Sequence, residues 1–113
     1  MSLPIEHGTP VYDVAGMPAF GHPTPFDKLT LDGGGTPDAT TVVFQAGKSY
    51  EITSDVDFCY LLAASSPVAD NADNFLGAKI PRIITPTTDV LMSAIDLGDA
   101  GSVWISSLAR YGE

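Results

Sequence analysis

The stretch Lys48-Ser49-Tyr50-Glu51-Ile52-Thr53-Ser54 indicates the fold class, because its apolar and polar side chains alternate. Tyr50 and Ile52 share one face of the extended chain, and the polar residues beside them share the other. This period of two is typical of a β-strand with one buried and one solvated face. Residues 40–45, just before it, are rich in β-branched and aromatic residues, so the two segments together predict a hairpin that turns at Ala46-Gly47.

Four later segments also have strand character, namely residues 58–64, 78–85, 89–96 and 102–108. Residues 58–64 are continuously apolar and are expected at the centre of a sheet, whereas Pro81 marks 78–85 as an edge or bulged strand. A glycine-containing turn joins the last two segments and predicts a terminal hairpin. Short strands separated by turn residues predict an all-β fold, a small antiparallel β-sandwich or barrel.

The N-terminal part of the chain has a different composition. Residues 1–38 hold six of the nine prolines and six of the eleven glycines, which discourage regular structure. Apolar residues such as Phe20 and Phe26 punctuate this stretch, so we expect it to dock on its own domain or on a neighbour. The sequence therefore predicts an extended N-terminal arm over 1–38, a flexible joint at 33–35, and a small β domain over 39–113.

Charge, length and cysteine content limit the partners. The net charge of −9 disfavours direct binding of nucleic acid, which depends on Lys and Arg. A domain this small has a thin core, and the single Cys59 excludes an internal disulfide, so we expect a homo-oligomer. No apolar run reaches the roughly 20 residues that span a bilayer. We therefore expect a protein made in the cytoplasm with no membrane partner.

The acidic and metal-ligating residues do not match a known site. Oxygen ligands for calcium would come from residues 70–74, but Ala72 stands at the third position of that loop, so Asx turns are the favoured interpretation. His7 and His22 together with Cys59 would lack a fourth zinc ligand. Cys59 lies in an apolar segment, which predicts a buried, inert thiol with a raised pKa. We predict no catalytic, cofactor-binding or metal-binding residues and no enzymatic activity.

Aromatic residues offer an alternative, a carbohydrate-binding face built from Tyr12, Tyr50, Tyr60, Trp104 and Tyr111. Aromatic rings pack against sugar rings, and acidic side chains accept hydrogen bonds from sugar hydroxyls. Tyr50 and Trp104 lie inside predicted strands, however. Burial of both rings in the sheet is therefore the interpretation we favour.

Residues 44–108 also resemble a group of small virion proteins of tailed bacteriophages. The matching segments are Gly47-Lys48-Ser49-Tyr50-Glu51-Ile52-Thr53-Ser54, Tyr60-Leu61-Leu62-Ala63-Ala64-Ser65, Pro67-Val68-Ala69, Ile80-Pro81-Arg82 and Val103-Trp104-Ile105-Ser106. The likeness lies in the layout of strands and loops and covers about two thirds of the chain.

The resemblance implies a structural role in a virion. The most direct expectation is a capsid decoration, or cement, protein that binds the major capsid protein on the outer shell and stabilises the head. Proteins of this kind often form trimers, so a trimer is the oligomer that the resemblance favours. Two alternatives stay open: a head-to-tail adaptor or tail or fibre component, and a glycan-binding β module.

Overall fold

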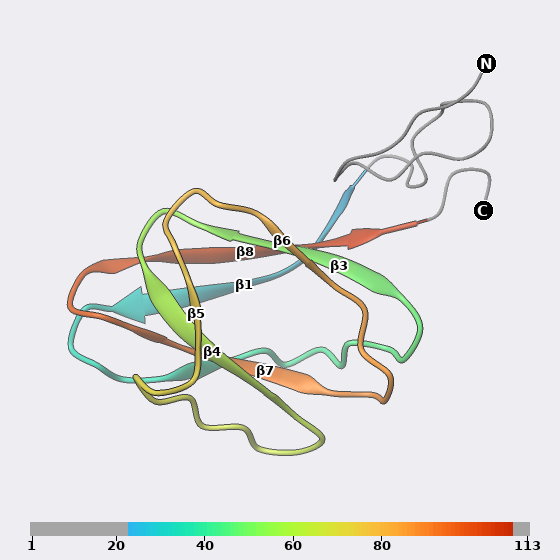
Figure 1. Cartoon of the computed structure of the whole chain (residues 1–113), viewed down its shortest axis with the longest axis horizontal. Helices are drawn as coiled ribbons and strands as arrows, with labels where there is room; N and C mark the ends of the chain where they lie inside the picture. The colour runs from blue at the N-terminus through green and yellow to red at the C-terminus, as the bar shows by residue number, and fades with distance from the viewer. Residues whose placement is uncertain (1–22, 110–113) are drawn as a thin grey trace.

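Eight β-strands and no helix make up the described chain, residues 23–109 of this computed structural model (Figure 1). All the strand pairs in this part of the chain are antiparallel. The strands are β1 (Thr24–Asp32), β2 (Asp38–Ala39), β3 (Ser49–Ser54), β4 (Phe58–Ala63), β5 (Asn74–Leu76), β6 (Arg82–Ile84), β7 (Leu91–Asp96) and β8 (Ala100–Leu108).

The strands form two four-stranded sheets. The first sheet has the order β1-β8-β3-β6, and the second has the order β2-β7-β4-β5. Four hydrogen-bonded pairs are nested in sequence: β1 with β8, β2 with β7, β3 with β6, and β4 with β5. The chain is thus one long hairpin wound into two layers, which is the jelly-roll arrangement. Figure 1 shows β4 of the second sheet running obliquely to β8 and β1 of the first. The predicted all-β antiparallel fold is confirmed, and of the two expected forms, sandwich and barrel, the structure is a sandwich.

The core lies between the sheets and is filled by the alternate residues that each strand turns inward. Tyr50 and Ile52 of β3 and Val103 and Ile105 of β8 are almost completely buried there. At one end of the core, Phe44 contacts Tyr50 and the partly buried Phe26, with ring centroids 4.6 and 5.4 Å apart respectively. This interior is the main stabilising element of the domain, because burial of apolar surface is the dominant favourable term in folding.

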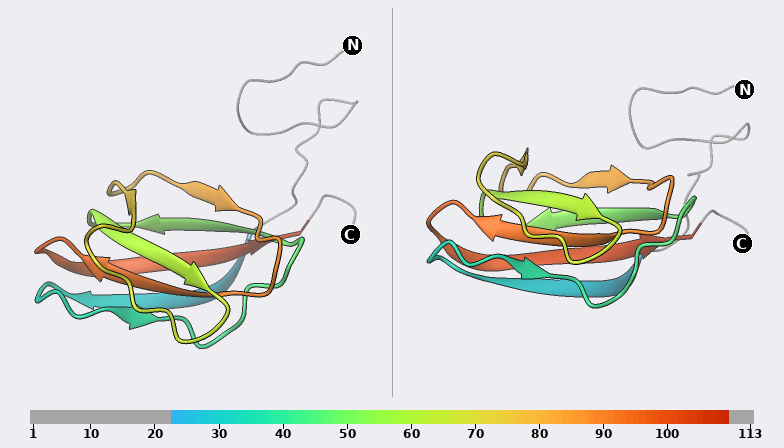
Figure 2. Two further views of the ribbon diagram at one scale, coloured as in Figure 1. Left: turned by 60° about the horizontal axis from the view of Figure 1, so that its bottom comes forward. Right: turned by 90° about the horizontal axis from the view of Figure 1, so that it is seen from below.

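Both ends of the described chain lie at one end of the first sheet. Thr24 at the start of β1 is paired with Ser107 near the end of β8. Figure 2 shows the start of β1 and the end of β8 lying together at that end of the sandwich. At the opposite end the antiparallel order places four short connections, residues 33–37, 55–57, 77–81 and 97–99.

The expectation of an arm over residues 1–38 is wrong for its second half. Residues 24–32 form β1, the longest strand together with β8, because Leu29 and Leu31 alternate with polar residues and point into the core. Gly33-Gly34-Gly35 is a tight turn within the domain, where Gly33 and Gly35 adopt φ angles of 80° and 79° that favour glycine. The β domain therefore begins before residue 39, and residues 1–22 lie outside the described part.

Two expected hairpins are also replaced by other pairings. Residues 40–45 do not form a strand with β3; only Phe44 makes a bridge, to Val90. β7 and β8 match the two segments of the expected terminal hairpin, but they belong to different sheets, since residues 97–99 carry the chain across the sandwich. The positions expected for two strands are confirmed: β4 lies inside its sheet, and β6, just after Pro81, is an edge strand.

Candidate interaction surface

Trp104 lies on the outer face of the first sheet and is 42% exposed. The expectation that its ring is buried is wrong. Its neighbours in β8, Val103 and Ile105, are 0% and 1% exposed and point into the core. Because successive side chains of a strand point to opposite faces, Trp104 must point outward. Tyr50, the other ring expected in the sheet, is buried as predicted.

Polar side chains surround the exposed ring. In the ladder, Trp104 is paired with Lys28 of β1 on one side and with Thr53 of β3 on the other. Ser102 and Ser106 precede and follow it on the same face of β8. The diagonal neighbours are the ladder partners of these two serines: Thr30 for Ser102, and Pro25 and Glu51 for Ser106. We call the following seven residues the Trp104 face: Lys28, Thr30, Glu51, Thr53, Ser102, Trp104 and Ser106.

Within residues 23–109, the six polar side chains of the Trp104 face have no hydrogen-bond or ion-pair partners. Two exposed apolar residues border the face: Pro25 of β1, which is paired with Ser106, and Ile83 of edge strand β6, which is paired with Glu51. The face therefore presents one aromatic ring, four hydroxyls, one ammonium and one carboxylate to the surroundings.

The other aromatic residues considered from the sequence do not join this face. The Tyr50 hydroxyl accepts a hydrogen bond from the Gln45 amide at 2.8 Å. The buried Tyr60 hydroxyl accepts one from the Arg82 guanidinium at 3.0 Å, and the same guanidinium lies 5.9 Å from the Tyr60 ring centroid. Both rings thus have structural partners, and Tyr12 and Tyr111 lie outside the described residues.

Cys59 is buried, as predicted, but on the outer face of the second sheet. The loop of residues 64–73 covers it, and the thiol donates a weak hydrogen bond to the Asn71 carbonyl, with sulfur and oxygen 3.8 Å apart. Burial raises the pKa of the Cys59 thiol, and the negative charges of Asp73 and Asp70 raise it further. These three effects all disfavour the thiolate, which is the reactive form.

The acidic residues of the loops serve as turn-forming groups. Asp70 accepts a hydrogen bond from the Ala72 amide, and Asp73 accepts one from the Asp70 amide, both at 2.8 Å, which agrees with the expected Asx turns. Asp55 and Asp57 accept hydrogen bonds from the backbone amides of Ser102 and Ala78, respectively. Among residues 23–109 no three acidic, histidine or cysteine side chains are grouped so as to hold a metal ion. His7 and His22 are outside this range.

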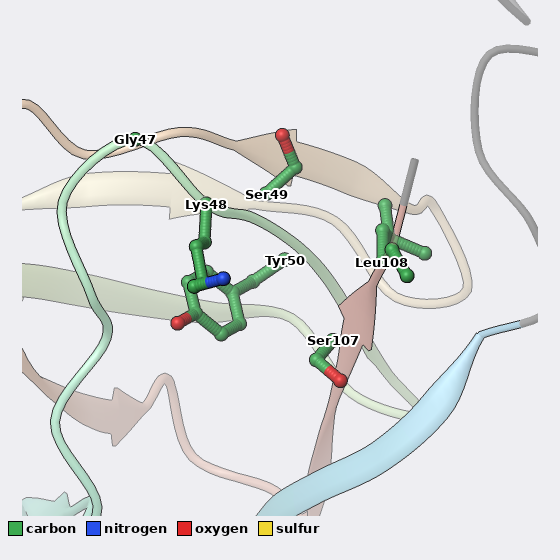
Figure 3. A pocket seen from close by; sticks show the side chains of 7 residues that line it. Gly47, Lys48, Ser49, Tyr50, Ser107 and Leu108 are labelled. Carbon is green, nitrogen blue, oxygen red and sulfur yellow. The ribbon is translucent and has the colours of Figure 1, made fainter. Parts of the chain in front are cut away.

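A pocket of about 230 Å³ lies at the end of the domain where the described chain begins and stops. Figure 3 shows Lys48 and Tyr50 beside it, with Ser107 and Leu108 from the end of β8. Tyr50 contributes a buried ring, whereas Lys48 is exposed. The pocket therefore lies between the start of β3 and the end of β8.

The sequence contains a signal for the Trp104 face that runs against the expected burial of the tryptophan ring. Trp104 lies between the apolar Val103 and Ile105, and residues two apart in a strand share a face. The alternation therefore places the ring on the polar face, together with Ser102 and Ser106. Lys28 and Thr30 were not expected on this face, because they fell within the expected arm. The part of the chain that the structure describes contains no helix that could cross a membrane.

In comparisons with known proteins, no family model, no curated protein and no solved structure significantly matches this chain.

Proposed function

We propose that the protein is a non-enzymatic structural component of a tailed-phage virion, and specifically a capsid decoration protein that binds the outer shell and stabilises the head. Support comes from the sequence layout described above and from the jelly-roll topology, which viral capsid domains use. A fold hosts many functions, however, so the proposal depends on how this domain presents its ends.

The pairing of Thr24 with Ser107 is the observation that carries the proposal. It makes residues 1–23 leave the domain at one end. A segment of that length reaches up to about 75 Å when extended. An N-terminal segment fixed at one end of the sandwich is suited to lie across neighbouring shell subunits while the rest of the domain is displayed outward.

The opposite end has the charge expected of a displayed surface. Exposed aspartates at residues 32, 55, 57 and 99 lie in or beside its short connections, and Lys79 is the cation among those connections. Uncompensated negative charge keeps a protein surface solvated and repels like-charged surfaces. This end is the one we assign to the exterior of the particle.

Binding to particles that lack the protein tests the proposed attachment. The full chain should co-sediment saturably with purified particles, and deletion of residues 1–22 should abolish this while leaving the circular dichroism of the β-sandwich unchanged. Asp99→Asn at the opposite end is the matched control and should bind like the unmodified chain. Undiminished binding of the folded deletion variant would overturn the role of the N-terminal segment.

A further inference from the structure

We propose that the Trp104 face is a binding site for a neutral oligosaccharide. The site is distinct from the proposed attachment through residues 1–22 and does not depend on it. Its centre is an aromatic ring that stands on the inner strand β8 of the first sheet, flanked by β1 and β3, and is 42% exposed. A large ring exposed on a sheet offers apolar surface, against which the C–H face of a sugar ring can pack.

The surroundings of the ring fit a saccharide. Neighbouring strands lie about 4.8 Å apart and residues two apart along a strand about 6.6 Å, so the hydroxyls of Thr53, Ser102 and Ser106 surround a sugar stacked on Trp104. Lys28 completes the row on the other side. All of these groups are free of bonds to the described chain, so they are available to the several hydroxyls of a sugar ring.

Charge and polarity decide the class of ligand. The chain carries a net charge of −9, and on the face itself the charges of Lys28 and Glu51 balance, so an acidic glycan would find no net positive charge there and would be disfavoured by the chain as a whole. The core of a protein–protein interface is depleted of charged residues and enriched in apolar ones. Trp104 has instead six polar neighbours on its face. A neutral oligosaccharide carries no negative charge and has many hydroxyls for the polar neighbours of Trp104, so it is the class of ligand that fits this face.

Trp104 is the single tryptophan of the chain, so its emission reports on this site alone. The full chain would first be applied to an array of short neutral oligosaccharides of glucose, galactose, mannose and N-acetylglucosamine. Each sugar that binds would then be titrated while tryptophan emission is followed. We expect a saturable change in emission for at least one of them.

Two variants test whether the face is responsible. Trp104→Ala, followed by calorimetry, should bind the sugar at least about tenfold more weakly. Phe75→Ala removes an exposed ring from the outer face of the other sheet and should bind normally. The inference would be overturned if no neutral oligosaccharide on the array bound the chain, or if only acidic sugars bound it. It would also be overturned if Trp104→Ala bound the sugar with the same affinity as the unmodified chain.

Particle binding separates this inference from the proposed function. Trp104→Ala should still co-sediment with particles, because attachment is assigned to residues 1–22. Loss of co-sedimentation in this variant, without any sugar binding by the unmodified chain, would make the Trp104 face a protein contact and would contradict the oligosaccharide site.

Discussion

The amide of Ala69 donates a buried hydrogen bond of 3.0 Å to the hydroxyl of Ser93 on β7. This bond fastens the loop of residues 64–73 to the outer face of the second sheet, where the loop covers Cys59. The second sheet therefore has both faces buried near β4 and β7, one by the core and one by the loop. The first sheet, by contrast, leaves the Trp104 face open.

Ser93→Ala should destabilise the domain. The substitution leaves the buried Ala69 amide without its partner, which costs about 1 to 3 kcal/mol of unfolding free energy. Ser106→Ala removes a hydroxyl that makes no such bond and should stay within about 0.5 kcal/mol of the unmodified chain. Urea unfolding measures both. Equal stability of the two variants would mean that the loop is not held by this bond.

The loop also controls the acidity of the Cys59 thiol. Asp73→Asn removes a negative charge that raises the pKa of Cys59 while keeping a side-chain oxygen for the Asp70 amide. We expect the pKa of the thiol to fall in this variant, as followed by thiolate absorbance against pH. A pKa unchanged by the substitution would contradict a contribution from the Asp73 charge.

The raised thiol pKa makes the stability depend on pH in a defined direction. The unfolded chain loses the Cys59 proton near the ordinary thiol value of 9.0, whereas the folded chain retains it to higher pH. The unfolded state then binds fewer protons, so the unfolding free energy should fall as the pH rises through 9.0. Cys59→Ala should lack this component, and an identical pH slope for both proteins would contradict it.

Aromatic substitutions should separate the core from the Trp104 face. Phe44 is completely buried against Phe26 and Tyr50, so Phe44→Ala should cost about 3 to 5 kcal/mol of unfolding free energy. Trp104→Ala should cost no more than about 1 kcal/mol. Denaturant unfolding measures both, and a loss at Trp104 as large as that at Phe44 would show that the tryptophan ring is part of the core.

Gly101 is a position where a methyl group has no room. An added Cβ would overlap the carboxylate of Asp55 and would lie 2.7 Å from both γ-methyl carbons of Val56, so Gly101→Ala should lose about 1 to 3 kcal/mol of unfolding free energy. At Gly34 the nearest atom would be 3.5 Å away, an ordinary contact, and Gly34→Ala is the matched control. Similar melting temperatures for the two variants would contradict the close packing of residues 55–57 on β8.

The sequence predicted strand character better than strand partners. Alternation located β3, β7 and β8 within one or two residues, because every second side chain of each strand points into the shared core. It could not show that β7 and β8 lie in different sheets, since a short connection serves a hairpin and a crossing equally well. Proline and glycine concealed β1, although Leu29 and Leu31 already alternate with polar residues.

The candidate surface was the part least accessible to prediction. Whether Trp104 faces the core depends on which set of alternate β8 residues points inward. The large apolar ring suggested burial more strongly than its serine neighbours suggested exposure. The pairing of Trp104 with Lys28 requires β1, which the sequence had assigned to the arm. The burial of Cys59 under its loop likewise depends on the hydrogen bond between Ala69 and Ser93, which are too far apart in the sequence for a local pattern to predict it.

The proposal of a capsid decoration protein is tested most directly by quantitative mass spectrometry of purified particles from the source that encodes this chain. The predicted result is hundreds of copies per particle, as expected for a protein that repeats over the symmetric shell. About a dozen copies would contradict decoration and indicate an adaptor or tail component. Absence of the chain from the particles would contradict any role in the virion.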